Sequence, residues 1–235
     1  MAMTGKIRTL LLTGRNNHDW TRSAPFCRDL LRRSGLFDVT MTERPWEVLA
    51  DAAALRGVQL FFLDWNDRAE SVGAQARANF EAAVSDGAGV CILHAADNAF
   101  PGWVEFEKMV GQLWRQGTSH GRFHEFPVTF VDRDHPITQG LADYRTTDEL
   151  YHNLIHMHGV TCHVLATAFS STESGGTGKQ EPVHVVMQYG GGRVFHQVLG
   201  HVWPGNPNLI AFENEGFQRV TLRACEWTAA GKVTL

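Results

Sequence analysis

The stretch Gly89-Val90-Cys91-Ile92-Leu93-His94-Ala95-Ala96 places five residues without a charged side chain directly before a histidine. A short continuous apolar run of this kind is typical of a strand that is buried on both faces of a parallel sheet. Short runs rich in apolar residues, each with one charged residue, also occur at 7–12, 37–41 and 60–64. Residues that follow such strands lie at the carboxyl edge of the sheet, where open α/β folds bind ligands. His94 is therefore a candidate functional residue.

Longer amphipathic segments separate these apolar runs. Apolar side chains recur at helical spacing between Val72 and Val84, which predicts a helix over residues 71–86 with one face against a sheet. Another helix is expected to begin near Ser23 and to end at Gly35. The alternation predicts an α/β fold in which helices cover both faces of a mostly parallel central sheet, giving three layers.

The second half of the chain contains more strands than helices. Strands are predicted at residues 122–125, 128–131, 163–169, 183–189 and 194–199. Three consecutive glycines, Gly190 to Gly192, join the last two strands and predict a hairpin. A polar loop is expected at 170–180 and a closing helix within 208–230. Since no linker or repeat interrupts the pattern, we expect a single domain over residues 1–235.

Composition excludes several classes of protein. Of the 235 residues, 43% are hydrophobic and 20% charged, which is typical of globular proteins, and the net charge is -4. The chain has no cluster of basic residues for nucleic acid and no apolar run near the roughly 20 residues that cross a bilayer. Residues 1–6 lack the pattern of a secretion signal, so a cytoplasmic location and free thiols at all four cysteines are expected.

Three of the twelve histidines follow predicted strands: His18, His94 and His201. We expect them to meet at one edge of the sheet, although each one alone could serve only to order its loop. His18 and His201, with His94 or His152 as the third ligand, could hold a divalent metal such as zinc. Alternatively, histidines could act as general acid and base. No HExxH or HxH spacing decides between these interpretations.

Carboxylates and aromatic residues near these loops complete the candidate site. Asp19 or Glu149 could fix the tautomer of a catalytic histidine, so both join His94 as candidate catalytic residues. Aromatic faces flanked by polar groups suit a sugar. The candidate sugar-binding residues are Asn17, Trp20, Trp65, Tyr151 and His152. The plainer alternatives are a solvated loop at 148–153 and tryptophans that serve packing.

Two other chemistries are not supported by the sequence. The chain has no GxSxG or GxCxG motif, and Cys91 falls inside a predicted strand instead of at the turn after it. Gly87 and Gly89 precede that strand, whereas a dinucleotide-binding loop follows one. No nucleotide cofactor is therefore expected.

Several motifs together resemble the ThuA-like trehalose-utilisation family. They occur in the family's order and cover nearly the whole chain. They are Leu11-Leu12-Thr13-Gly14, His18-Asp19-Trp20, residues 35–40, Leu93-His94-Ala95-Ala96, residues 134–141, Thr147-Asp148-Glu149-Leu150-Tyr151, residues 189–195 and Leu199-Gly200-His201. The resemblance implies a flavodoxin-like fold similar to the class I glutamine amidotransferase domain. It also places His94 where amidotransferases carry cysteine, which argues against amide hydrolysis.

The resemblance further implies a carbohydrate-catabolic enzyme acting on trehalose-type or keto-disaccharide substrates. A ketone acidifies the neighbouring C–H bond, so a base could remove that proton and the glycosidic oxygen could leave. His18 and His201 would hold a metal ion or the oxyanion, His94 or Glu149 would move protons, and Trp20 and Tyr151 would bind sugar. The chain lacks the aromatic residue expected at Val185 or Val186, which leaves the substrate open.

Two alternatives to this sugar-cleaving function stay open. The chain could be a non-catalytic sugar-binding or regulatory module, or an amidotransferase-like hydrolase. The expected partner is a small sugar, without nucleic acid or membrane, and a homo-oligomer is allowed.

Overall fold

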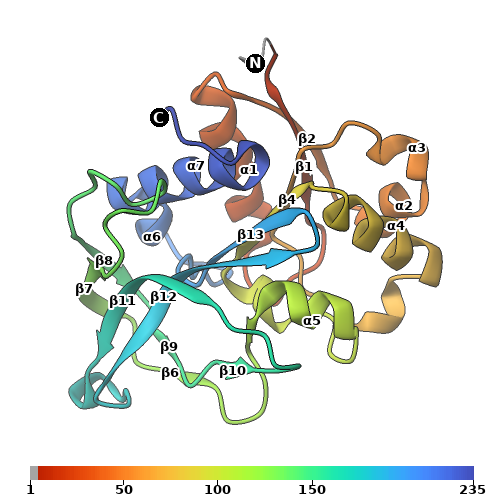
Figure 1. Ribbon diagram of the computed structural model, residues 1–235. Helices are drawn as coiled ribbons and strands as arrows, with labels where there is room; N and C mark the ends of the chain where they lie inside the picture. Colours follow the sequence, from red (N-terminus) through yellow and green to blue (C-terminus); the bar gives the residue numbers. More distant parts are fainter. Residues whose placement is uncertain (1–4) are drawn as a thin grey trace.

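The computed structural model describes residues 5–235, arranged around one nine-stranded sheet with the strand order β2-β1-β3-β4-β13-β12-β11-β7-β8 (Figure 1). Residues 1–4, and with them most of the segment judged to lack a secretion signal, lie outside the described residues. The predicted α/β fold with a central sheet is confirmed.

Five strands run parallel at one side of this sheet; four were expected from short apolar runs and the fifth as the second strand of the glycine hairpin. Pairing is parallel from β2 through β1, β3 and β4 to β13. Their bounds are β1 Ile7–Leu12, β2 Phe37–Thr42, β3 Leu60–Leu63, β4 Gly89–Leu93 and β13 Gly192–Gln197. The order 2-1-3-4 followed by the last strand is that of flavodoxin-like folds.

The other side of the sheet is antiparallel. The predicted hairpin at the three glycines joins β12 (Lys179–Tyr189) to β13. Strands β11 (His163–Ser170), β7 (His124–Phe130) and β8 (Tyr144–Asp148) continue the sheet. The two strands expected at 122–125 and 128–131 are one strand, because Pro127 of β7 pairs with Arg145 without interrupting the register.

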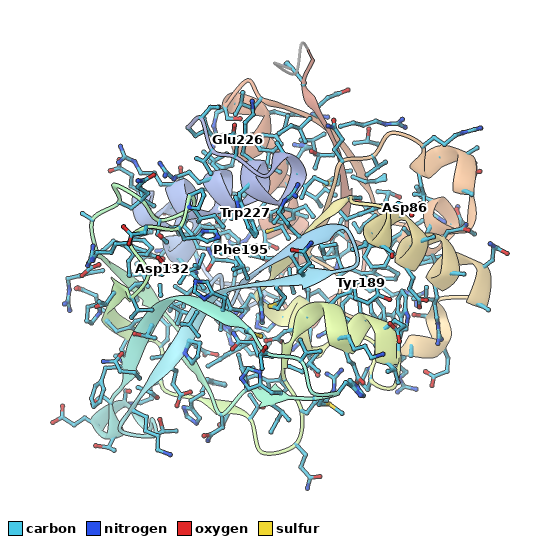
Figure 2. All side chains as sticks on the ribbon, in the orientation of Figure 1. Asp86, Asp132, Tyr189, Phe195, Glu226 and Trp227 are labelled. Carbon is cyan, nitrogen blue, oxygen red and sulfur yellow. The ribbon has the colours of Figure 1, made fainter. Side chains whose placement is uncertain are left out.

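Helices cover both faces of the sheet. Figure 1 shows α1 (Trp20–Arg33), α6 (Ile210–Glu213) and α7 (Glu215–Ala230) on one side. Phe195 of β13, labelled in Figure 2, belongs to the core on this side, and the partly buried Trp227 of α7 packs against that core. The other core contains residues of α2 (Pro45–Ala50), α3 (Ala52–Leu55), α4 (Ala74–Ser85) and α5 (Val104–Val110).

The alternation of side chains along β1 explains these two cores. Leu11 belongs to the core beside α1 and α7, whereas Leu12 belongs to the core beside α4 and α5, and both are fully buried. Because successive residues of a strand point to opposite faces, a strand covered on both faces must be apolar throughout. This requirement accounts for the buried, apolar sequences of β3 and β4, whereas β1 carries the exposed Arg8 near its start.

Short elements occupy the remaining loops. Three 3-10 turns are η1 (Ala69–Ser71), η2 (His94–Asn98) and η3 (Thr172–Ser174), the last lying within the expected polar loop. Two small antiparallel pairs join β5 (Gln112–Leu113) to β10 (Ile155–His156) and β6 (Ser119–His120) to β9 (Tyr151–His152). They lie outside the main sheet and place residues of the middle of the chain near the site described below.

Three predicted helix bounds need correction. The first helix begins at Trp20, with Pro25 inside it, and not near Ser23. The helix expected over 71–86 begins at Ala74. The closing helix is divided at Asn214, whose side chain accepts hydrogen bonds from the backbone N–H groups of Gly216 and Phe217 and so begins a new helix.

Two further expectations concern thiols and membranes. All four cysteines are free, as predicted. Within residues 5–235, the helices are too short or too polar to cross a bilayer.

Gly89 provides a test of the close packing of β4 against α7. A Cβ atom at Gly89 would lie 2.5 Å from backbone atoms of Thr228, whereas one at Gly5 meets nothing within 4 Å. We expect Gly89→Ala to lower the free energy of unfolding by about 1–3 kcal/mol or more, because backbone cannot yield as a side chain can. Gly5→Ala should leave it nearly unchanged. Urea denaturation of both variants measures the difference, and equal midpoints would contradict the packing described.

Candidate active site

Three histidines meet at the carboxyl edge of the parallel strands, where the sequence placed them. His18 lies in the loop after β1, His94 directly follows β4, and His201 lies in the loop after β13. His18 Nε2 is 3.0 Å from His201 Nδ1, and His94 Nε2 is 3.3 Å from that same atom. All three side chains are buried. We call these three residues the histidine cluster.

His94 occupies a sharp turn between β4 and η2. Its φ angle is 42°, a left-handed value that a residue other than glycine adopts at some cost. Its Nδ1 lies 2.6 Å from the carbonyl oxygen of Val198, an atom that can only accept, so this nitrogen carries the proton. Its Nε2 therefore presents a lone pair, to which the hydroxyl of Tyr151 donates at 2.8 Å.

His18 is held in the same tautomer by two asparagines. Its Nδ1 lies 3.2 Å from Asn17 Oδ1, and the amide nitrogen of Asn66 donates to that oxygen at 2.8 Å. Since Asn17 Oδ1 is an acceptor, His18 Nδ1 carries the proton and Nε2 presents its lone pair to the cluster. Asn16 adds a second restraint, because its side-chain oxygen accepts from the backbone N–H of His18.

His201 is positioned through its backbone by the buried carboxylate of Asp148, at the end of β8. Asp148 accepts hydrogen bonds from the N–H groups of Gly200 at 2.8 Å, His201 at 3.1 Å and Glu149 at 2.8 Å. Burial raises the pKa of Asp148 to about 7 against the opposing effect of these hydrogen bonds. One side chain thus fixes the positions of both Glu149 and His201.

The carboxylate of Glu149 lies at the edge of the histidine cluster. Its Oε2 is 3.3 Å from His201 Nδ1 and also 3.3 Å from His120 Nδ1. Burial raises the pKa of Glu149, while the neighbouring His120 and a hydrogen bond from Trp203 lower it. A carboxylate that binds a proton more readily than usual therefore lies beside the ring nitrogens.

Burial keeps the histidine cluster uncharged near neutral pH. It lowers the pKa of His18 to about 4 and of His201 to about 3, and lowers that of His94 well below its usual value, with neighbouring histidines acting in the same direction. Neutral imidazoles are the form that binds metals. Electrostatics thus favours lone pairs over protonated, cationic rings at this place.

The arrangement of nitrogen atoms fits a divalent cation. The lone pairs on Nε2 of His18 and Nε2 of His94 both point at His201 Nδ1, and that of His94 also accepts from the Tyr151 hydroxyl. Tetrahedral zinc, with bonds of about 2.0–2.1 Å, holds its ligand nitrogens about 3.3 Å apart. The two separations to His201 Nδ1, 3.0 and 3.3 Å, are close to this value, and all three ligand nitrogens lie within 4.8 Å of one another. His18, His94 and His201 could therefore hold such an ion.

A pocket of about 110 Å³ lies beside the histidine cluster, and His18 of that cluster forms part of its lining. It is lined by Asn17, His18, Ala95, Asn98, Trp114, His120, Glu149, Tyr151 and Trp203. The indole of Trp203 stacks on the ring of His18 at 4.8 Å and is 42% exposed, so part of its surface faces solvent. Aromatic faces with a few polar groups are the usual lining of a site for a small polar organic ligand.

The structure brings some predicted site residues to this pocket and places others elsewhere. Asn17, Tyr151 and Glu149 line it with His18. Trp65 is corrected: its ring is 1% exposed and packs against Phe100 in the core, so no face is free for a sugar. This tryptophan serves packing, the plainer alternative.

Three other predicted residues have partners outside the histidine cluster. The Asp19 carboxylate accepts from the Thr21 hydroxyl at the start of α1 and contacts no histidine among the described hydrogen bonds, so no tautomer is set by it. Trp20 begins α1 and does not line the pocket. His152 contacts Ser170 at 3.3 Å and does not belong to the group of metal-compatible ligands.

Sequence reasoning missed several residues around the pocket. Trp114, His120 and Asn98 line it, and Asp148 positions it, yet none was chosen as a site residue. His120 lies in β6 and Trp114 directly follows β5. Both strands have two residues, which is too short for a periodic pattern in the sequence. Only the density of polar residues at 148–153 pointed towards this region.

Comparison with known proteins assigns the chain to a family. The family model for ThuA, described as trehalose utilisation, matches residues 8–228. The chain belongs to the ThuA family. A ThuA-like protein from Parabacteroides merdae is 34% identical with a TM-score of 0.88, over 98% of this chain and 92% of that one. The resemblance stated from sequence motifs and the fold class are thereby confirmed.

More distant structures share the fold. A ThuA-like protein from Bacteroides uniformis is 13% identical with a TM-score of 0.75, over 99% of this chain and 97% of that one. A β-galactosidase from Rahnella sp. R3 is 16% identical with a TM-score of 0.58, over 94% of this chain but 31% of that one. No curated protein matches the sequence.

The lowered pKa of His18 predicts acid-sensitive folding in chelator-treated protein. Between pH 6.5 and 4 the unfolded chain binds a proton at His18 that the folded chain excludes, so stability falls as the pH falls through this window. At 1.36 kcal/mol per pKa unit the loss approaches about 3 kcal/mol. His18→Gln should flatten this dependence, measured by urea denaturation across pH. His124→Gln, outside the cluster, should not; an equal effect of both would count against the burial mechanism.

Proposed function

We propose that this ThuA-family chain is a carbohydrate-catabolic enzyme that cleaves trehalose-type disaccharides bearing a ketone. The observation that carries the proposal is the meeting of three uncharged imidazoles, His18, His94 and His201, beside Glu149 in an aromatic pocket. Hydrophobic ring faces bind the sugar, while converging nitrogens and a carboxylate supply the groups that an elimination requires. The family description, trehalose utilisation, agrees with this substrate class.

The proposal includes a divalent ion such as zinc, held by His18 Nε2, His94 Nε2 and His201 Nδ1. When bound, such an ion supplies positive charge that stabilises a developing enolate oxygen. His94 is a better third ligand than His152, because the ring of His152 faces Ser170 and not the cluster. The Val198 carbonyl and Asn17 would orient the rings of His94 and His18 by holding the Nδ1 protons.

Glu149 is the proposed general base. In the elimination, the base takes the proton at C2 beside the C3 ketone, the C1–O bond breaks, and the departing oxygen gains a proton. Addition of water across the new double bond then completes a net hydrolysis. Glu149 suits this role better than His94, because both nitrogens of His94 already have partners and its pKa is far below neutral.

Tyr151 is the proposed donor to the sugar. Burial raises the pKa of its hydroxyl well above 10, so the proton stays on the oxygen. The hydroxyl now donates to His94 Nε2 and could turn to a substrate oxygen once that nitrogen has another partner. Its ring, stacked on His94 at 4.2 Å, is fixed for such a contact.

Two other interpretations differ in the residues they need. A non-catalytic sugar-binding or regulatory module would need only the exposed face of Trp203 and the polar lining. An amidotransferase-like hydrolase would need an accessible thiol, but Cys91 is fully buried inside β4 and the turn after it carries His94. A cytoplasmic location and the formation of a homo-oligomer stay predictions.

His94→Asn tests catalysis without removing a residue that tolerates the turn. Asparagine adopts left-handed backbone more readily than alanine, so the fold should survive. Glu149→Gln should lower kcat for 3-keto-disaccharides at least about a hundredfold, the usual contribution of a general base. His94→Asn removes a proposed ligand of the ion and should lower turnover as well. If wild-type protein leaves a panel of 3-keto-glycosides intact with and without divalent metal, the enzymatic proposal fails and sugar-induced thermal stabilisation would favour the binding module.

Elemental analysis tests the metal. Purified protein should contain about one divalent ion per chain, as three-histidine sites do. His201→Ala and His18→Ala should lose it, whereas His152→Gln should keep it, because that ring lies outside the cluster. If the His152→Gln variant loses the ion and the His94→Asn variant keeps it, His152 and not His94 is the third ligand.

A further inference from the structure

A second hollow opens next to the proposed active site. It has a volume of about 290 Å³ and is lined by Arg122, Phe123, His124, Ser171, Glu173 and Ser174. The ring of Phe123 belongs to this hollow and also lies 6.2 Å from the ring of His201, so it stands between the hollow and the histidine cluster. We call this hollow the Phe123 pocket.

The composition of the Phe123 pocket suits a sugar. The phenyl ring of Phe123 lines it together with an imidazole, two hydroxyls, a guanidinium group and a carboxylate, which can pair with the apolar face and the hydroxyls of a pyranose. Phe123 is 41% exposed, although no strand or helix requires an aromatic side chain there. This exposed ring is therefore available to contact a ligand next to His201.

Hydrogen bonds hold the wall of this pocket in place. The polar segment 170–180 contains η3, and the backbone N–H of Arg122 donates to Ser174 O at 2.7 Å. The guanidinium of Arg122 donates to Glu173 O at 2.6 Å, and the Ser174 hydroxyl donates to Ser171 O at 2.8 Å. The wall is therefore formed before any ligand binds, which lowers the cost of binding.

We propose that the Phe123 pocket binds the leaving-group sugar of a disaccharide, while the pocket at the histidine cluster binds the ring that reacts. This inference rests on the proposed function. The smaller pocket, about 110 Å³, leaves little room for a second ring, and Phe123 offers the next aromatic face beyond His201. The ligand class is thus a neutral disaccharide, and Phe123 determines the preference for a sugar leaving group over a small one.

Binding of trehalose and methyl α-glucoside, measured by calorimetry, tests the pocket without any reaction. Wild-type protein should bind the disaccharide at least about tenfold more tightly, as an added aromatic contact implies. Phe123→Ala should abolish most of this advantage and leave methyl glucoside unaffected. Phe169→Ala is the matched control, since Phe169 is 47% exposed and lines neither pocket. Equal affinities in wild-type protein, or equal losses for both ligands in Phe123→Ala, would overturn the proposal.

Turnover of the corresponding 3-keto compounds separates this inference from the proposed function. Phe123→Ala should raise KM for the keto-disaccharide about tenfold and leave kcat/KM for the methyl keto-glucoside within about twofold. Wild-type protein that cleaves both compounds with equal kcat/KM would retain the proposed function and overturn the second pocket. If wild-type protein cleaves neither compound but binds trehalose more tightly in calorimetry, the second pocket is retained and the proposed function is overturned.

Discussion

The site depends on the confinement of β4 in the middle of the sheet. Strand β4 pairs with β3 on one side and β13 on the other, and helices cover both of its faces. Its backbone and side chains are thereby buried, so the chain can turn towards a ligand only beyond Leu93. Because β1 and β13 run parallel to it in this sheet, their loops reach the same edge. The meeting of the three histidines follows from this geometry.

Burial then determines the chemistry of that edge. The same desolvation acts on imidazoles and carboxylates in opposite directions, keeping His18 and His201 neutral while it raises the pKa of Glu149. An exposed cluster would be partly protonated below neutral pH and would repel a cation. A buried one offers lone pairs beside a carboxylate that binds a proton more readily than usual. Such a combination suits removal of a weakly acidic C–H proton.

The residues that could be predicted are those that follow directly from strand order. His18, His94 and His201 each follow a parallel strand, and this relation is visible in sequence. The direction of a side chain in a loop is not visible in sequence. Trp65, two residues after β3, was therefore predicted to bind sugar, but it packs against Phe100. Trp114 and His120 are brought to the pocket by two-residue strand pairings between distant segments, and such pairings depend on tertiary structure.

The position of His94 limits what this fold can do here. At φ 42° directly after β4, its side chain is presented at the turn itself, and the Val198 carbonyl fixes which nitrogen faces the cluster. A thiol at such a turn could form a covalent bond to a substrate, as the resemblance to amidotransferases implies for their cysteine. An imidazole with its Nδ1 proton engaged can instead donate a lone pair to a cation or accept a proton. With a lone pair instead of a thiol at this turn, covalent attack from this position is closed, which agrees with the proposed roles of His94 as a ligand and of Glu149 as the base.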